Sequence, residues 1–164
     1  MQLLLLRHAS AEDSPSAGDS DADRRLTDDG HDEARLAARA MTQMGLAPSL
    51  VLTSPYRRAL ETARPVAAML DVELVRERRL QPGFDPSAFA ALAELHGAER
   101  SLLLVGHEPD LSRLVHYLTG ARVAMRKSGL ALIEVPTLRP GGCELRFLLR
   151  PDQMRLIATA RVTA

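Results

Sequence analysis

Arginine and histidine side chains follow apolar segments at three places along the 164-residue sequence. Arg7 and His8 come directly after the run LLLL. His107 follows SLLLVG, and Arg58 lies shortly beyond SLVLT. Burying a charge without a partner is costly, so each apolar segment is expected to end where these side chains begin. Because ligands of open α/β sheets bind at the carboxyl ends of strands, we expect the four side chains to meet in one cleft. Two arginines and two histidines at one site indicate an anion as ligand, and arginine forks match phosphate oxygens.

Other phosphate-binding and metal-binding motifs are absent from the sequence. It contains no GxxxxGK[ST] and no GxGxxG, which leaves a P-loop site and a dinucleotide fold unsupported. It also contains no HExxH and no Cys/His cluster at metal-ligand spacing, so no metal site is predicted. The formal net charge is zero, which gives no support for nucleic acid or an anionic membrane as a partner.

The expected location is the cytoplasm. The single cysteine, Cys143, rules out an internal disulfide, which is compatible with a reducing compartment. The apolar start Leu3–Leu6 is too short for a signal peptide or a membrane span, and no basic segment precedes it.

Strands and helices alternate among the elements that would position these side chains. Predicted strands occupy residues 2–6, 49–53, 72–75, 101–105, 130–135 and 144–149. Predicted helices begin after Thr27, at Ser54, at Pro86 and at Pro109. The alternation favours a layered α/β fold with a mostly parallel sheet, and the last two strands favour an antiparallel hairpin. The length favours a single domain over residues 1–164.

Helix boundaries are predicted from capping residues. Thr27 is a good N-cap and precedes two aspartates. Ser54 is expected to cap the second helix, with Pro55 at its first position, where the missing N–H costs nothing. Pro65 is expected to kink or divide that helix.

Residues 9–26 are expected to form a long loop. Its residues up to position 23 include five acidic side chains and no basic one: Glu12, Asp13, Asp19, Asp21 and Asp23. Loops of this length in compact domains are usually functional or mobile. Two interpretations stay open, a lid over the site or a solvated acidic surface.

Four motifs together resemble the histidine phosphatase superfamily, also called the phosphoglycerate mutase-like family. They are RHA at 7–9, LTDDG at 26–30, SPYRRALETA at 54–63 and GHEPDLSRLVHYLTG at 106–120. The short chain, the RHA form and the last segment are most similar to the SixA-type phosphohistidine phosphatases. The resemblance extends, in order, over nearly the whole chain.

The resemblance implies a fold and a set of site residues. The fold would be a three-layer α/β/α sandwich with a mixed sheet, and the family needs no metal or other cofactor. His8 would be the catalytic nucleophile, and Arg7 and Arg58 would hold the phosphoryl group. His107 would complete the pocket, and we expect it to be protonated where it meets the charge on the oxygens of the transferring phosphoryl group. Two nearby arginines should keep His8 neutral, as a nucleophile must be.

The carboxylic acid that serves many members of the superfamily as proton donor is missing here. Its position falls near Gln81–Pro82, where the sequence has no carboxylate. A labile P–N bond tolerates a weak acid better than a phosphate ester does, so the absence favours phosphohistidine as substrate and disfavours mutase activity. Glu108 is either a substitute donor or a charge at a helix start. Ser10 is a candidate for hydrogen bonding to phosphate.

The expected partner is a phosphorylated protein carrying phosphohistidine, of a phosphorelay or phosphotransferase type. The alternative is a small phosphate ester, such as a sugar, nucleotide or isoprenoid phosphate, cleaved by the same mechanism. A third hypothesis is a phosphate-binding module without turnover. Arg57 is expected at the surface. The basic run Arg76, Arg78 and Arg79 is either a solvated face or a guide for an acidic protein.

Overall fold

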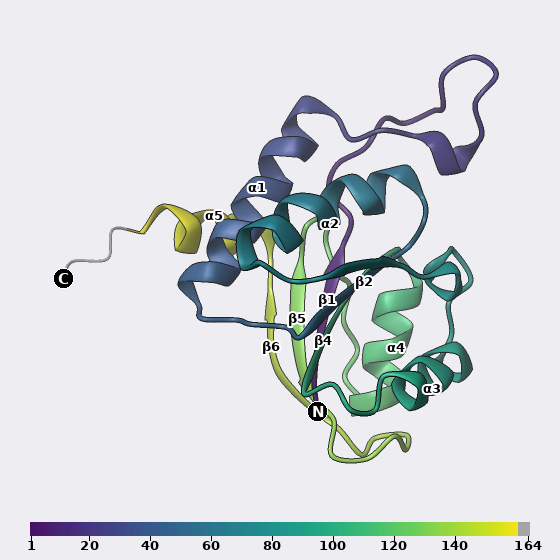
Figure 1. The fold of residues 1–164 in the computed structure, drawn as a ribbon, viewed down its shortest axis with the longest axis vertical. Helices are drawn as coiled ribbons and strands as arrows, with labels where there is room; N and C mark the ends of the chain where they lie inside the picture. The colour runs from purple at the N-terminus through teal and green to yellow at the C-terminus, as the bar shows by residue number, and fades with distance from the viewer. Residues whose placement is uncertain (161–164) are drawn as a thin grey trace.

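A six-stranded sheet forms the centre of the molecule in the computed structural model, which describes residues 1–160 (Figure 1). The strand order is β3-β2-β4-β1-β5-β6. The strands are β1 (Gln2–Arg7), β2 (Leu50–Thr53), β3 (Leu74–Arg76), β4 (Ser101–Gly106), β5 (Leu130–Glu134) and β6 (Glu144–Leu149). Strand β4 pairs in parallel with β1 and β2, and β2 pairs in parallel with β3. Strand β5 pairs antiparallel with both β1 and β6. The predicted mixed, mostly parallel sheet is confirmed.

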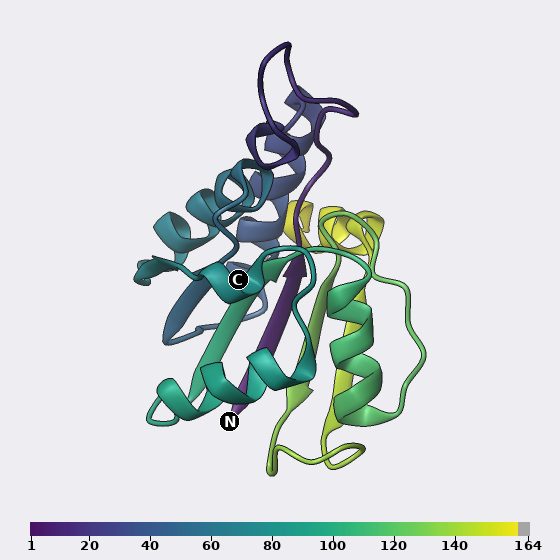
Figure 2. The same ribbon diagram turned by 90° about the vertical axis from the view of Figure 1, so that its right-hand side faces the viewer.

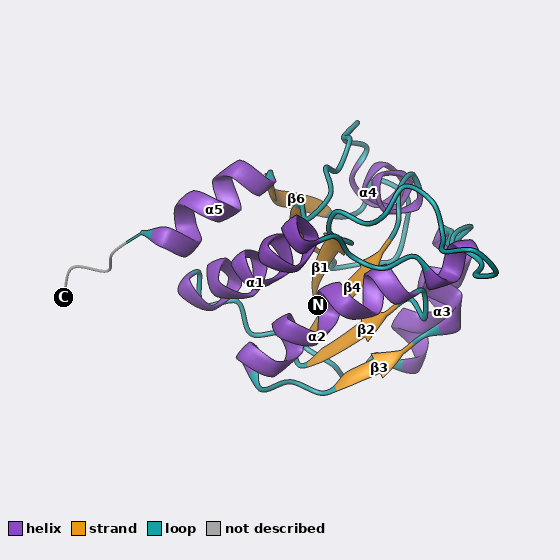
Figure 3. Ribbon diagram, turned by 90° about the horizontal axis from the view of Figure 1, so that it is seen from above, coloured by secondary structure: helices purple, strands orange, loops and turns teal. Residues whose placement is uncertain are grey.

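Helices cover both faces of this sheet (Figures 1 and 3). One face carries α1 (Asp28–Gln43), α2 (Arg57–Leu70) and α5 (Pro151–Thr159). The other carries α3 (Pro86–Leu95) and α4 (Asp110–Thr119). Single 3-10 turns, η1 (Asp21–Asp23) and η2 (Arg78–Leu80), lie in the loops after β1 and β3. The expected three-layer α/β/α sandwich is therefore confirmed. Within the described residues, no helix is both long and apolar enough to cross a membrane.

The leucine run of β1 is explained by its central place in the sheet. Leu3 and Leu5 pack into the core beneath α3 and α4, and Leu4 and Leu6 pack into the core beneath α1, α2 and α5. Successive side chains of a strand point to opposite faces, so a strand covered on both sides needs apolar residues at every position.

The carboxyl ends of β2, β4 and β1 lie next to one another at one edge of the sheet (Figure 2). Arg7 pairs with Gly106 across β1 and β4, and Thr53 pairs with Val105 across β2 and β4. The residues that follow these strands therefore share one end of the molecule. This is the arrangement expected from the sequence.

Several element boundaries differ from the expectation. The second helix begins at Arg57, with Tyr56 as N-cap, and not at Ser54. The helix also continues through Pro65 to Leu70 and is not divided, because Val66 and Ala67 beyond the proline are buried in the core. The C-terminal helix α5 was not predicted. Thr27 caps α1 as expected, its hydroxyl accepting a hydrogen bond from the Gly30 N–H.

Candidate active site

His8 follows the end of β1 and is almost completely buried, with 7% of its surface exposed. Its Nδ1 lies 2.8 Å from the backbone oxygen of Ala9. A carbonyl oxygen can only accept, so Nδ1 carries the hydrogen and the lone pair lies on Nε2. Within residues 1–160, Nε2 has no hydrogen-bond partner. The ring is therefore held in the tautomer that a nitrogen nucleophile requires.

Burial lowers the pKa of His8 to about 4. The positive charges of Arg58, Arg7 and Lys127 act in the same direction, against the hydrogen bond to Ala9. His8 is therefore uncharged near neutral pH, as expected. Lys127 was not assigned a role from the sequence. It lies beside the site because the Ser128 N–H, next along the chain, donates to the backbone oxygens of both Arg7 and His8.

His107 follows β4, and its ring centroid is 5.2 Å from that of His8. Its Nε2 is 2.8 Å from the Ser54 hydroxyl, which also accepts from the Tyr56 N–H. Ser54 and Nε2 share one hydrogen bond, in which either group can be the donor. Nδ1 of His107 is buried and has no partner among the described residues. The site thus holds a ring nitrogen that makes no hydrogen bond with the described part of the protein.

The surroundings of His107 within the protein favour a neutral ring, whereas the protonated ring was expected only against the charge of a transferring phosphoryl group. Burial lowers its pKa to about 3; the repulsion between the two rings if both were protonated and the charges of Arg58 and Arg7 add to this effect, while Asp21 opposes it. His107 is therefore neutral, because a buried ring facing two guanidinium groups disfavours a further positive charge. A phosphoryl dianion bound next to His107 would favour the protonated ring, because it would add negative charge.

Arg58 lies in the first turn of α2 and is 5% exposed. Its Nη1 donates to the backbone oxygen of Asp21 at 2.7 Å, and its Nη2 donates to the Asp21 carboxylate at 3.0 Å. The guanidinium also lies over the Tyr56 ring, with 5.0 Å from Cζ to the centroid. Arg57 points outward and pairs with Glu61 at 2.7 Å. The structure thus places Arg58 with the histidines and Arg57 at the surface, as expected.

Arg7 is held at the end of β1 by a hydrogen bond from Nη1 to the backbone oxygen of Met125 at 2.8 Å. Its Nε is buried and has no partner in the described part of the chain. Burial and the charge of Arg126 lower the pKa of Arg7, and Glu108 raises it, but a guanidinium stays charged at any physiological pH. Arg7 therefore offers a charged donor that the protein itself does not use.

Comparison with known proteins is consistent with these features. The model of the histidine phosphatase superfamily (branch 1) matches residues 3–82, which include Arg7, His8 and Arg58. An uncharacterized protein of Picosynechococcus sp. is 34% identical over 140 residues, covering 79% of this chain and 82% of its own. The chain belongs to the histidine phosphatase superfamily.

Solved structures of histidine phosphatases share the whole fold. The structure of the protein histidine phosphatase SixA complexed with tungstate matches with a TM-score of 0.83 and 26% identity. It covers 93% of this chain and 98% of its own. The alpha-ribazole phosphatase from Shigella flexneri matches with a TM-score of 0.76 and 18% identity, covering 92% and 97% of the two chains. At that identity the second match shows the fold alone.

Two further candidate residues of this histidine phosphatase have partners within the protein. The Ser10 N–H and hydroxyl both donate to the Glu33 carboxylate, each at 2.9 Å. Glu108 accepts from the Ser112 N–H at 3.1 Å and from the Ser112 hydroxyl at 2.7 Å. The Glu108 contacts are those of a charge at the start of α4, which was one of the two interpretations left open.

The carboxylates closest to the expected acid position are engaged as well. Glu77 accepts from Arg79 through both its N–H and its guanidinium. Asp85 caps α3 by accepting from the Ala88 N–H at 2.8 Å, and Asp110 accepts from the Gly83 N–H at 2.7 Å. These acids stabilise local turns of the chain.

The depressed pKa of His8 predicts a specific loss of stability in acid. Between pH 6.5 and 4 the unfolded chain binds a proton at His8 that the folded protein does not bind. The free energy of unfolding therefore falls as the pH drops through this window, by roughly 1 kcal/mol per pH unit for one histidine. Urea titrations should show a steeper fall for the wild type than for His8→Gln. His116→Gln, which changes an exposed histidine of α4, is the control and should keep the wild-type slope. Equal slopes for wild type and His8→Gln would contradict the prediction.

Proposed function

We propose that this histidine phosphatase hydrolyses phosphohistidine in a signalling or phosphotransfer protein, through a covalent phosphohistidine formed on His8. The observation that carries the proposal is the neutral His8 with a free Nε2 lone pair, buried beside two guanidinium groups. A neutral imidazole can attack phosphorus, and fixed positive donors around it can stabilise the charge of the transferring group.

The reaction would run in two displacements. In the first, the His8 Nε2 lone pair forms a bond to phosphorus, and the bond to the leaving nitrogen breaks with its electron pair, which takes a proton from water. In the second, a water molecule attacks the same phosphorus and loses a proton to solvent. The P–Nε2 bond breaks and its electrons return to Nε2. Inorganic phosphate and free His8 result.

The other pocket residues would bind the phosphoryl oxygens. Arg7 has its unpaired Nε, His107 has its unpaired Nδ1, and Arg58 has the guanidinium that Asp21 occupies in the unliganded protein. These donors would meet the charge that spreads over the equatorial oxygens in a largely dissociative transition state. Ser10 would join them only by releasing Glu33.

The choice of a P–N bond rests on the leaving group. An alkoxide leaves poorly without a proton donor, whereas the imidazole of phosphohistidine is a much better leaving group. The carboxylates around the expected acid position are all engaged by their own chain, as described above. The match to the structure of SixA, a protein histidine phosphatase, supports the same substrate class.

A small phosphate ester is the second candidate substrate. The observation that favours it is the shared fold with the alpha-ribazole phosphatase, which shows that the same scaffold serves such a phosphatase. A phosphate-binding module without turnover is the third hypothesis, and it predicts binding of phosphate with no phosphorylated His8.

A competition assay separates these functions. A phosphohistidine protein and a panel of sugar, nucleotide and isoprenoid phosphates are offered together, with a metal chelator present throughout. The proposal expects release of phosphate from the phosphohistidine protein at the higher kcat/KM. Fast turnover of an ester, with the phosphohistidine protein left intact, would show that the substrate is a small phosphate ester. Binding of these compounds without release of phosphate would support only the third hypothesis, a phosphate-binding module.

A further inference from the structure

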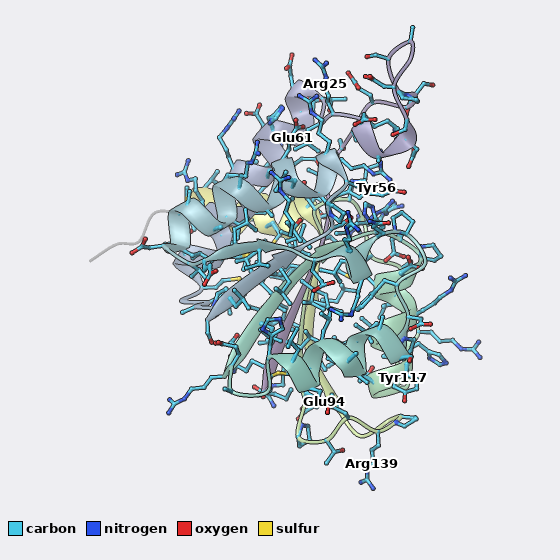
Figure 4. The ribbon with its side chains drawn as sticks, turned by 45° about the vertical axis from the view of Figure 1, so that its right-hand side comes forward. Arg25, Tyr56, Glu61, Glu94, Tyr117 and Arg139 are labelled. Atoms are coloured by element: carbon cyan, nitrogen blue, oxygen red, sulfur yellow. The ribbon has the colours of Figure 1, made fainter. Side chains whose placement is uncertain are left out.

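A cavity of about 450 Å³ opens beside the catalytic residues, between η1, the segment before α2 and the turn around η2. It is lined by Ala22, Pro55, Tyr56, Arg78 and Gln81. Figure 4 shows Tyr56 at the end of the molecule where the loop carrying η1 lies. The volume falls within the range of ligand pockets, about 300–1,000 Å³, and exceeds what a phosphoryl group needs.

Tyr56 connects this cavity with the pocket of the two histidines. Its ring centroid is 5.2 Å from that of His107 in an edge-to-face arrangement, and Arg58 lies over its face. The ring is half-buried, and the surface that it leaves exposed lines the cavity. A group attached to a phosphoryl in the catalytic pocket would therefore extend along Tyr56 into this space.

Arg78 is the one charged residue among the five that line the cavity, and its side chain is exposed. It makes no ion pair within residues 1–160, whereas the adjacent Arg79 pairs with Glu77 at 3.1 Å. The acids flanking Ala22 on the opposite side are engaged. Asp21 binds Arg24 and Arg58, and Asp23 accepts from Ser20. The cavity thus presents a guanidinium that has no ion-pair partner in the described part of the chain.

Gln81 adds a neutral polar group to the same wall. Its side-chain amide makes no hydrogen bond within the described residues, and an amide can both donate and accept. An imidazole leaving group carries a second ring nitrogen that acts as donor or acceptor according to its tautomer. The amide can serve either form.

We propose that this cavity is the leaving-group subsite. The imidazole of the substrate packs against Tyr56, and an acidic residue next to the phosphohistidine of the carrier protein binds to Arg78. The inference rests on the proposed function and narrows its substrate class to phosphohistidine with a carboxylate neighbour. Charge-assisted contacts between a guanidinium and a carboxylate are strong and directional, so Arg78 would select among carrier proteins.

Three synthetic phosphohistidine peptides of equal length test the subsite. One has Asp and Glu beside the phosphohistidine, one has Ser and Gln there, and one has Lys. The wild type should hydrolyse the acidic peptide with a kcat/KM about fivefold above that of the neutral one, a size suited to one partly solvated ion pair. Arg78→Ala should abolish this preference, and Arg78→Glu should shift it to the lysine peptide. The neighbouring Arg79→Ala is the matched control and should keep the wild-type preference.

The outcomes separate the subsite from the reaction. Equal turnover of all three peptides by the wild type, still lost in His8→Ala, would overturn the subsite and leave the proposed function intact. A preference that Arg79→Ala removes and Arg78→Ala retains would also overturn it. Peptides left untouched by the wild type, alongside fast hydrolysis of esters, would overturn both proposals.

Discussion

His8→Ala is expected to lower the turnover of phosphohistidine by at least about a thousandfold, since loss of a nucleophile commonly costs this much or more. The reason lies in the geometry around the ring. The Ala9 carbonyl fixes the hydrogen on Nδ1, which leaves the Nε2 lone pair as the reactive group. No other described residue offers an unprotonated ring nitrogen in the same position, because His107 has its Nε2 engaged by Ser54.

The measurement combines phosphate release with trapping of the enzyme intermediate. The wild type, quenched in base during turnover, should carry one acid-labile phosphoryl group on His8, and the alanine variant should carry none. His116→Ala removes an exposed histidine from α4 and should behave as the wild type. A label that persists on another residue in His8→Ala would contradict the assignment of the nucleophile.

Arg58→Ala is expected to reduce kcat/KM by roughly a hundred- to a thousandfold, the usual cost of losing one preorganised donor to a developing anion. Arg58 is buried beside both histidines, so its charge acts through little solvent. Arg58→Lys should recover only part of the activity, because an ammonium group cannot reproduce a guanidinium fork.

The adjacent arginine provides a matched control for this prediction. Arg57 has the same side chain one residue earlier, but it is exposed and pairs with Glu61. Arg57→Ala should therefore stay within about twofold of the wild-type kcat/KM, the scale of a surface ion pair. Thermal unfolding of each variant checks that the fold is retained. Equal losses in Arg57→Ala and Arg58→Ala would show that net charge, and not the position of Arg58, supports the reaction.

The gathering of the site residues was predictable because it depends on regular features. Parallel strands that end at one edge of a sheet bring together whatever follows them, and the apolar runs before His8 and His107 indicate both strands. The distinction between Arg58 and Arg57 came from the resemblance to the family. The structure gives its physical basis in the burial of one side chain and the exposure of the other.

Capping rules predicted the wrong start for α2, because the Ser54 hydroxyl makes a hydrogen bond to a residue of the site. Ser54, followed by a proline, is of the residue type that commonly caps helices. Its hydroxyl instead makes a hydrogen bond with His107, and the helix begins three residues later. Helix α5 was missed because its apolar pattern is weak, with Met154 and Ala158 as its only buried residues. The low pKa of His107 could not be predicted from the sequence, because it depends on burial and on neighbours that are distant in sequence.

The contact of Asp21 with Arg58 lay beyond sequence reasoning for a similar reason. The two residues are 37 positions apart, and Asp21 is one of several acids in a loop whose local composition does not distinguish them. Only the folded loop shows which carboxylate reaches the site. Neither interpretation of the loop, lid or solvated surface, included this contact.

The Asp21 carboxylate therefore places an anion of the protein itself on Arg58. A phosphoryl group that took both Nη groups of Arg58 would have to replace the backbone oxygen as well as the carboxylate of Asp21. A phosphoryl group bound by both Nη groups would gain only the difference in free energy between its own contacts and those of Asp21. Because Asp21 belongs to η1, which also forms a wall of the adjacent cavity, a phosphoryl group that displaced Asp21 would act on a segment that borders that cavity.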